Sequence, residues 1–489
     1  MTPQSLQKIS RLALLLLSGA VVAATGCTSG MVSTGTTSPD AVTGPAFVVG
    51  TDAPLAAVVS FQTTITSITA NPTSGSPVCL ISSCTTGVSV DFARYNGLQT
   101  LLDDTDVPQG TYDSVTVTLG TSTIGYLNTT GSGAPTIQTI TPVTYSPSNS
   151  VTVTLAKPLV VAASDGEPAG LRIDFDLAKS IELSNGTVNG TVDPTFNIST
   201  VTRTDTNAHI DELIGGVVTV PSGTTEPSSF VIQGPHGRNF TINTTSSTQW
   251  DGNASLSTLS TSDIVQVSGQ MDPADQTLDA DEVAILSDKG FYATGQITYV
   301  LPPTGTSSAA PGFDLYVRAL EPTDTGLSLG QIADVTLTGT EKYYIFSMDN
   351  PLTQFLFNSS SLVAGQDVAI GGPASGAANA ADVTVDRIHL RNWGFNGTIV
   401  SGSQNSGDGT FQMQVNGFAG VLIPTPVTVF LGGHCDFRYG FGGFSDLTDG
   451  TNVRVVGLLL KNPTTGQLVL WARHVDGIDM TDFATAAWQ

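Results

Sequence analysis

Two carboxylates on one strand are the first residues whose spacing could support chemistry. Asp174 and Asp176 are two residues apart in an alternating stretch, so in a β-strand their side chains share one face, roughly 7 Å apart. Such a pair could carry acid–base catalysis or hold a hard cation. Arg172 and Lys179 flank the pair, however, and would neutralise it. We therefore expect a solvated, charged strand face rather than a functional pair.

Two further acidic clusters are rich in the oxygen ligands that calcium prefers. Neither matches an EF-hand loop, which needs glycine at its sixth and glutamate at its twelfth position. We expect ordinary turn chemistry at both, with aspartate side chains bonding to the nearby backbone. The clusters consist of Asp103, Asp104 and Asp106, and of Asp272, Asp275, Asp279, Asp281 and Glu282.

Catalytic sequence motifs are absent. There is no G-x-S-x-G elbow, no Walker loop and no dinucleotide fingerprint, which are the common signatures of nucleophile, phosphate and cofactor sites. The five histidines form no H-x-x-x-H or Cys/His cluster. His389 and His474 occupy the same place in two repeated segments, which we attribute to a shared position in the fold. The sequence therefore predicts no catalytic residue, no metal and no other cofactor.

Cys79 and Cys84 are five residues apart, with no His or further Cys nearby. A metal site would need more ligands than this. In an oxidising compartment the two can close a small loop, and we predict a disulfide between them. Cys435 is then the odd cysteine, and we expect it to be buried as a small hydrophobe rather than reactive.

Residues 1–27 have the layout of an export signal. Lys8 and Arg11 supply the positive charge that precedes an apolar stretch at 12–24. That stretch is too short to span a bilayer stably and fits the apolar region of a signal peptide. We therefore predict an exported protein.

Residues 24–27 (Ala-Thr-Gly-Cys) resemble a bacterial lipobox, whose Cys receives a diacylglyceryl group and becomes the new N-terminus. Ala24 stands where such a box usually has Leu. We predict lipidation at Cys27, and the alternative is plain secretion after cleavage near Ala24. Residues 28–45 are rich in Ser, Thr and Gly, so we expect a flexible tether between the lipid and the first domain.

The most unusual stretch, residues 434–444, places four aromatic side chains among glycines. Such rings could form a stacking surface for a sugar or another flat partner. The alternative is an insertion loop that packs its rings against its own barrel. The candidate stacking residues are Phe437, Tyr439, Phe441 and Phe444.

The composition favours an all-β protein of several domains. Charged residues make up only 12%, and short Val/Thr/Ile/Phe runs alternate with Gly, Pro and Asn, which is typical of strands and turns. A chain of 489 residues has room for about three or four domains. The net charge of −24 repels phosphate backbones and anionic lipid headgroups, so we expect no nucleic-acid partner.

A first folded region, residues 46–201, shows apolar residues with period two, as in Leu171, Ile173 and Phe175. Half-buried strands of this kind favour antiparallel sheets packed as a sandwich. Five ordered segments of the region resemble the bacterial envelope family called domain of unknown function 4382. The resemblance implies a prealbumin- or immunoglobulin-like β-sandwich, usually on lipoproteins, without an established activity. The segments are 48–54 (VVGTDAP), 90–92 (VDF), 98–102 (LQTLL), 107–112 (VPQGTY) and 173–180 (IDFDLAKS).

The remaining chain contains a loose internal repeat whose units begin at Gly215, Gly295 and Gly397. Glycines that recur at strand ends suit the corners of small closed barrels. The pattern resembles domain of unknown function 5666, which is similar to oligonucleotide/oligosaccharide-fold (OB-like) barrels, although a shared fold does not transfer a ligand. We predict three small β-barrel modules, at residues 210–290, 291–392 and 393–480.

Together these features predict a non-enzymatic, lipid-anchored protein of the bacterial cell envelope that presents β modules for binding or scaffolding. We expect it on the outer membrane, periplasmic or surface-exposed, with a glycan or another envelope protein as partner. One alternative is a carbohydrate-binding surface protein that uses exposed aromatics such as Trp250, Trp393 and Phe441. A third possibility is a hydrolase with paired carboxylates.

Overall fold

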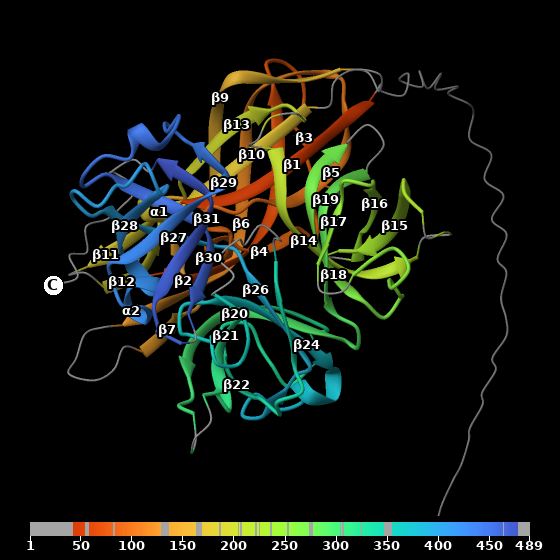
Figure 1. Ribbon diagram of the computed structural model, residues 1–489. Coiled ribbons are helices and arrows are strands. Elements are labelled where there is room, and N and C mark those ends of the chain that lie inside the picture. The colour runs from red at the N-terminus through yellow and green to blue at the C-terminus, as the bar shows by residue number, and fades with distance from the viewer. Residues whose placement is uncertain are drawn as a thin grey trace, which may run out of the picture. The chain divides into compact units, whose positions relative to one another are not determined.

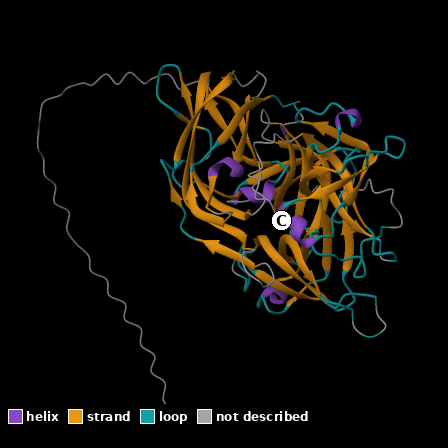
Figure 2. Cartoon of the chain, turned by 90° about the vertical axis from the view of Figure 1, so that its left-hand side faces the viewer, coloured by secondary structure: helices purple, strands orange, loops and turns teal. Residues whose placement is uncertain are grey.

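The computed structural model describes the chain between residues 43 and 477, and the predicted signal peptide and lipidation site at Cys27 lie outside this part. Strands dominate it (Figure 2), which confirms the all-β class. The short helical turns are η1 (Phe92–Tyr95), α1 (Leu177–Ser180), η4 (Ala374–Ala377), α2 (Gly417–Leu422) and η5 (Phe444–Asp446). Within it, the structure leaves out residues 54–57, 82–83, 129–135, 163–168, 185–186, 204, 206–207, 221–222, 224, 235–236, 252–253, 273–276, 304, 306–307, 324, 347–354 and 463.

The N-terminal domain, residues 43–201, contains three sheets, coloured red to yellow in Figure 1. Sheet I has the strand order β13 (Phe196–Val201), β10 (Ala169–Asp176), β1 (Thr43–Ala53) and β5 (Thr100–Pro108). Sheet II has the order β3 (Val78–Cys79), β2 (Val58–Pro72), β6 (Gly110–Asn128) and β7 (Thr136–Ile140), with β4 (Val88–Asp91) on β2 and β9 (Ser150–Val161) on β6. Sheet III is β11 (Ile181–Ser184), β12 (Thr187–Val192) and β8 (Thr144–Tyr145).

One hydrophobic core takes side chains from sheets I and II, among them Val48 and Ile173 from the first and Phe61 from the second. The prealbumin- or immunoglobulin-like sandwich itself stays a prediction. Phe47 and Val49, which alternate with Val48 on β1, belong to a different core that includes the first barrel. Sheet I is therefore buried on both faces, which suits its parallel pair β1–β10 because parallel strands are normally covered on both sides.

Two of the predicted modules are closed barrels. Barrel 1 runs β14-β15-β16-β19-β18 and returns to β14, and barrel 2 runs β27-β28-β29-β31-β30 and returns to β27. Barrel 1 consists of β14 (His209–Thr219), β15 (Ser228–Gln233), β16 (Asn239–Thr244), β18 (Ile264–Asp272) and β19 (Thr277–Ser287), with β17 (Gln249–Asp251) beside β19. Barrel 2 consists of β27 (Trp393–Ile399), β28 (Thr410–Val415), β29 (Val427–Arg438), β30 (Asn452–Lys461) and β31 (Leu468–Gly477).

The middle module keeps this order, but its third and fifth strands are each broken in two. β22 runs parallel to β25, and β23 runs parallel to β26, so two short ladders replace one continuous ladder. Its strands are β20 (Gly290–Val300), β21 (Gly312–Glu321), β22 (Ile332–Thr336), β23 (Lys342–Ile345), β24 (Asp367–Pro373), β25 (Val383–Thr384) and β26 (Arg387–Arg391).

The glycines that open the three repeats stand at equivalent crowded positions. A Cβ atom added at Gly215, Gly295 or Gly397 would lie 2.6, 1.8 or 2.2 Å from a carbonyl oxygen on the second strand of the same module. Backbone cannot yield as the end of a side chain can, so each position requires glycine. This is the physical reason for the repeat seen in the sequence.

We expect Gly295→Ala to destabilise the protein by about 3 kcal/mol or more, because the added methyl group forces two strands apart. Gly216→Ala is the matched control, since no atom lies within 4 Å of a Cβ built at Gly216. That change should stay within about 0.5 kcal/mol of the unmodified protein. Urea unfolding followed by tryptophan fluorescence measures both, and equal losses for the two variants would contradict the crowding argument.

Candidate ligand-binding cavity

Two edge strands of the N-terminal domain line one cavity. β5 is the last strand of sheet I, and β4 lies on the outer side of β2 in sheet II. The cavity between them and barrel 1 has a volume of about 580 Å³, which is within the usual range for small-ligand sites. Its walls are residues 86–90 and 100–106, Tyr95, and, from barrel 1, Leu213, Gly237, Arg238 and Phe240.

Arg238 brings barrel 1 into this cavity. It precedes β16, and its guanidinium forms ion pairs with both Asp103 and Asp104 of β5. Asp103 and Asp104 are only 3% and 2% exposed, and the guanidinium carbon lies 5.5 Å from the centre of the Phe240 ring. A guanidinium presents its donors in a planar fork, so one side chain can serve two neighbouring carboxylates.

The cavity carries an excess of negative charge. Asp103, Asp104 and Asp106 line it, and Arg238 is the one Lys or Arg among the described residues of the lining. Burial, with a smaller contribution from the nearby Asp106, raises the pKa of the Asp104 carboxyl to about 6. Burial also lowers the pKa of the Arg238 guanidinium. The net charge favours a cationic ligand, because complementary potentials are what charged sites recognise.

A β-bulge shapes β5 just before these carboxylates. Val48 of β1 pairs with Asp103 and Val49 pairs with Leu101, so Leu102 is an extra residue in the strand. Leu101 consequently packs in the core shared with barrel 1, whereas Leu102 packs in the core of the N-terminal domain. Bulges occur often at sheet edges and beside functional sites because they redirect the side chains that follow.

The predicted turn at Asp103, Asp104 and Asp106 is wrong, because these residues lie in the strand β5. Consecutive aspartates are typical of turns, but here Arg238, far away in the sequence, neutralises two of them inside a strand. No local sequence pattern shows that Arg238 pairs with these aspartates. The apolar Leu102 directly before them is the one local sign that the carboxylates would be buried.

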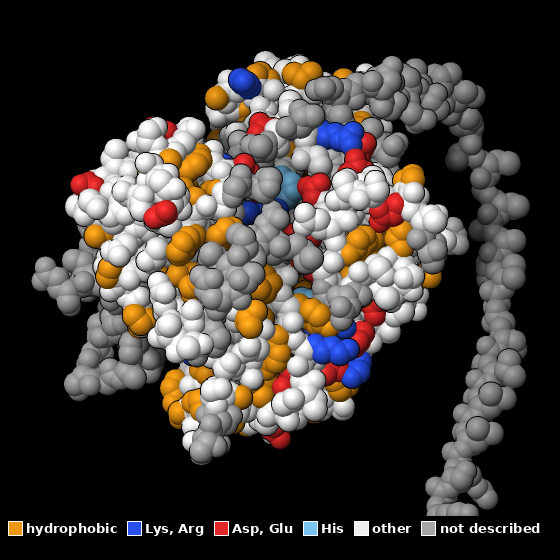
Figure 3. All heavy atoms as spheres, viewed as in Figure 1, with side chains coloured by type: hydrophobic (Ala, Val, Ile, Leu, Met, Phe, Trp, Pro, Cys, Tyr) orange, Lys and Arg blue, Asp and Glu red, His pale blue; other side chains and the backbone are white. Residues whose placement is uncertain are grey.

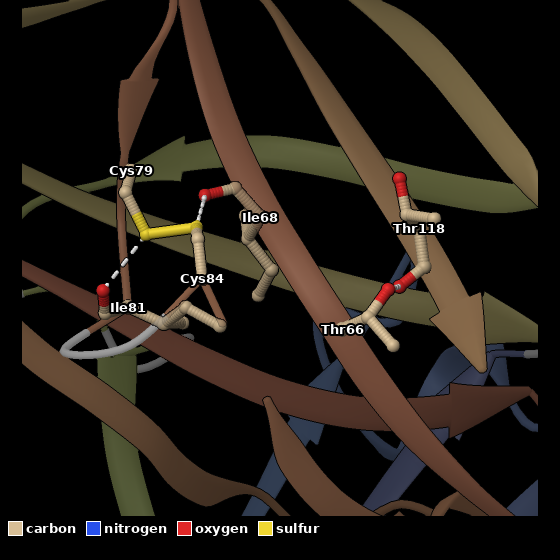
Figure 4. Close-up of a disulfide and its surroundings, with 6 residues drawn as sticks. All are labelled: Thr66, Ile68, Cys79, Ile81, Cys84 and Thr118. Atoms are coloured by element: carbon tan, nitrogen blue, oxygen red, sulfur yellow. Dashed lines mark hydrogen bonds between the residues drawn. A yellow bond between two sulfur atoms is a disulfide. The ribbon is translucent and has the colours of Figure 1, made fainter. Parts of the chain in front are cut away.

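Cys79 and Cys84 form a disulfide next to Ile68 of β2 (Figure 4). The two Cα atoms are 6.1 Å apart, and the Sγ atom of Cys84 lies 3.7 Å from the carbonyl oxygen of Ile68 on β2. Residues 86–90 of the cavity wall follow almost directly in the chain. The bond therefore fixes the segment that leads into β4.

Replacing both Cys79 and Cys84 by serine should lower the free energy of unfolding by about 2 kcal/mol, because the bond closes only a short loop in the unfolded chain. Dithiothreitol should cause the same loss in the unmodified protein. Urea unfolding with and without the reductant measures the effect. A reductant effect that persists in the double-serine variant would show that this bond is not its source.

A buried ion-pair network connects the N-terminal domain with barrel 1 and the middle module. Glu212 of barrel 1 pairs with Arg94 of the N-terminal domain and with Arg391 of the middle module. Arg391 also donates to Asp367 at 3.0 Å. Glu212, Asp367 and Arg391 are all buried, so their charges depend on one another.

The segment around η1 touches the other two modules as well. Arg318 of the middle module donates to the carbonyl oxygen of Ala93 at 3.1 Å and lies over the ring of Trp393 in barrel 2 at 4.4 Å. The Asn96 side chain donates to the carbonyl oxygen of Gly394 at 2.7 Å. Residues 93–96 thus contact all three modules. We name Arg94, Glu212, Arg318, Asp367 and Arg391 the central network.

Asp174 and Asp176 share one face of β10, but this face is not solvated as predicted. Asp176 is fully buried, caps α1 by accepting from the backbone N–H of Lys179 at 2.9 Å, and binds the Lys179 Nζ at 2.7 Å. Asp174 pairs with Arg172 at 3.5 Å, and Arg172 lies over the ring of Tyr439 in barrel 2 at 5.2 Å. Each carboxylate has a cationic partner, which disfavours a role in acid–base catalysis.

The second acidic cluster surrounds the β18–β19 hairpin. Arg203 joins Asp272 at 2.6 Å and Asp279 at 2.7 Å across the hairpin, so one guanidinium pairs with two carboxylates of the cluster. Asp275 lies outside the described residues. In the part of the chain that the structure covers, no group of three or more His, Cys, Asp or Glu is arranged to hold a metal ion.

The aromatic loop packs mainly on its own barrel. Phe437, Phe441 and Phe444 are partly buried against the core of barrel 2. Tyr439 is 40% exposed and lies beneath Arg172. The predicted stacking surface thus depends on Tyr439, while the other three rings are placed as the alternative interpretation expects.

Three other residues singled out in the sequence also pack in or against a barrel core. Trp250 lies against the core of barrel 1 and donates its indole N–H to Glu226 at 3.1 Å. Trp393 is only 6% exposed. Cys435 packs against the core of barrel 2, and burial raises the pKa of its thiol to about 12, so the nucleophilic thiolate is disfavoured.

The fold and the cavity define a class of protein: a multi-module all-β chain with a charged cavity between its first domain and its first barrel. Residues 46–192 match the family model described as "Domain of unknown function (DUF4382)", and residues 216–284 match the model described as "Domain of unknown function (DUF5666)". Both matches confirm the resemblances and the order inferred from the sequence. Neither description assigns an activity.

No curated protein matches the chain. Among solved structures, a chain described as Drosophila Unr CSD456 aligns with 10% sequence identity and a TM-score of 0.15. The alignment covers 55% of this chain and 98% of that one. A similarity this weak supports no statement about fold or function.

Proposed function

We propose that this chain is a non-enzymatic binding protein of the bacterial cell envelope, lipid-anchored at Cys27, and that its partner occupies the cavity between β4, β5 and barrel 1. The cavity is the observation that carries the proposal. It holds about 580 Å³ and contains the carboxylates of Asp103 and Asp104 with the guanidinium of Arg238. Carboxylates engaged in ion pairs recognise charge, whereas general acid–base catalysis needs a proton to be exchanged with substrate.

Hydrogen bonds at the start of β5 support this proposal, because they join the β5 wall of the cavity to barrel 1. The backbone N–H of Gln99 donates to the Asp211 carboxylate at 2.9 Å, and the Thr100 hydroxyl donates to the carbonyl oxygen of Glu212 at 2.9 Å. A cavity with fixed walls loses little conformational entropy when a ligand binds.

The envelope location rests on the export signal and on Cys27. Within the described residues, no helix is both long and apolar enough to cross a membrane. The test is fractionation of cells that express the full chain or its Cys27→Ser variant. The unmodified protein should sediment with membranes and the variant should be released. A variant that stays membrane-bound would refute the lipid anchor.

The binding role is tested with a photo-crosslinking amino acid introduced into the full chain in growing cells. Ser89 is the test position, since it is exposed on β4 and lines the cavity. Thr152, exposed on β9 of the same sheet, is the matched control. We expect a discrete crosslinked product at Ser89 that is absent at Thr152. Identical patterns at the two positions would refute a partner in the cavity.

A glycan-binding role is the second candidate, and the exposed ring of Tyr439 beneath Arg172 favours it. An aromatic ring can stack on the apolar face of a sugar. A glycan array probed with the unmodified protein and with Tyr439→Ala tests this role. Binding that is absent, or unchanged by the substitution, would remove it.

A further inference from the structure

We propose that the cavity binds an extended basic peptide segment, which adds as a strand to the edge of β5 that faces away from β1 and places a lysine or arginine beside Asp104 and Asp106. This inference rests on the proposed function and narrows it to one partner chemistry. Three features of the described residues carry it: the shape of the lining, the two sheet edges and the charge.

Most residues that line the cavity are consecutive in the sequence. It includes every residue from 100 to 106 on β5 and every residue from 86 to 90 leading into β4. A strand of seven residues extends over roughly 23 Å. A compact ligand would touch a few residues brought together from different elements, whereas an extended chain contacts consecutive residues along two strands.

Both strands end their sheets at this cavity. At its start, β5 is bonded to barrel 1, where the backbone N–H of Asp211 donates to the carbonyl oxygen of Gln99 at 2.9 Å. Past Thr100, the only strand that pairs with β5 in the described part of the chain is β1, on its other side. Edge strands of this kind accept an added strand through main-chain hydrogen bonds.

The negative charge of the β5 carboxylates favours a basic ligand. Asp103 and Asp104 already bind one guanidinium, that of Arg238, which shows that the edge of β5 suits a planar cation. Asp106 is exposed one step further along the same strand. The barrel 1 part of the lining adds the apolar side chains of Leu213 and Phe240. Since alternate side chains of a strand face opposite sides, the expected ligand alternates basic and apolar residues.

The test measures binding of a fluorescent eight-residue peptide of alternating arginine and valine to the mature full-length chain. One comparison peptide carries N-methyl groups on alternate backbone nitrogens, and another has glutamate in place of arginine. Arginine amide serves as the small-cation probe. We expect saturable binding of the arginine–valine peptide, at least tenfold weaker binding of the N-methylated peptide, and no binding of the glutamate peptide or of arginine amide at the same concentration.

Two pairs of variants locate the site. Asp106→Asn should weaken binding about three- to tenfold, whereas Asp281→Asn, at a carboxylate that is 67% exposed on barrel 1, should leave it unchanged. Ser89→Trp should block binding by filling the cavity, and Thr152→Trp should not. Because Asp106, Asp281, Ser89 and Thr152 are all exposed, none of these changes requires repacking of the core.

Each contrary result has a separate meaning. Equal binding of the N-methylated peptide would show attraction by charge without strand pairing, and tight binding of arginine amide would show a small-cation site. Either result overturns this inference. If no peptide binds while the crosslink at Ser89 in cells persists, the peptide chemistry is wrong and the binding function stands. If the crosslink is also absent, both proposals are refuted.

Discussion

Replacing Glu212 by glutamine should lower the free energy of unfolding by about 3–5 kcal/mol, the usual cost of leaving buried charges uncompensated. Glu212 is only 3% exposed and pairs with two guanidinium groups, those of Arg94 and Arg391. Without its charge, Arg94 loses this ion pair, and Arg391 keeps the one with Asp367 at 3.0 Å. Urea unfolding measured by circular dichroism gives the loss.

An exposed ion pair provides the matched control. Asp386 pairs with Lys289, and their side chains are 29% and 53% exposed. Solvent already screens this pair, so Asp386→Asn should cost less than about 1 kcal/mol. If Glu212→Gln costs no more than Asp386→Asn, the central network contributes little to stability.

The loss of stability in the Glu212→Gln variant should affect more than one module. Arg94 belongs to the N-terminal domain, Glu212 to barrel 1, and Arg391 to the middle module. Replacing Glu212 by glutamine therefore weakens two contacts between modules as well as the local packing. Limited proteolysis of the variant should cut between modules, near residues 202–208 and 288–290, at lower urea concentrations than in the unmodified protein.

The modules were predictable because their signals are local. The glycines at Gly215, Gly295 and Gly397 follow from one crowded backbone position per module, and such a constraint can be read from one sequence. The broken strands of the middle module were not predictable in this way, since they depend on how β22 and β23 pair with β25 and β26.

The cavity and the central network were missed because they join residues that are distant in the sequence. Arg172 and Asp174 alternate with apolar residues as on a solvent-exposed strand face, yet the ring of Tyr439 from barrel 2 lies against Arg172. The five residues of β26 are likewise all buried, although Arg387 and Arg391 are charged. Alternation identifies a strand and its two faces, but it does not show whether another module covers the polar one.

His389 should make the protein less stable as the pH falls. Its ring is fully buried, 4.8 Å from the ring of Tyr344. Burial, together with the nearby Arg387, lowers the pKa of His389 from 6.5 to about 3. Between these values the unfolded chain binds a proton that the folded chain does not, so stability falls with pH by about 1.4 kcal/mol per unit.

The comparison with His389→Phe isolates this effect, because phenylalanine keeps an aromatic ring beside Tyr344 and does not titrate. Urea unfolding at pH 7, 6, 5 and 4 should show the unmodified protein losing roughly 3 kcal/mol relative to the variant by pH 4. A difference that does not change with pH would mean that His389 is protonated in the folded state or that its module is already open.

His209 provides a control of opposite sign. Burial alone would lower its pKa, but the bonds to Asp211 and Asp281 outweigh burial and raise it above 6.5. The folded chain then holds the proton more tightly, so the stabilisation is fully present below pH 6.5 and is lost as the pH rises through the folded-state pKa. His209→Phe should therefore be most destabilising at low pH. His389→Phe should show its largest gain in stability over the unmodified protein at the same low pH. Two variants with opposite trends cannot both result from a general acid effect on the chain, and this contrast ties each slope to its own histidine.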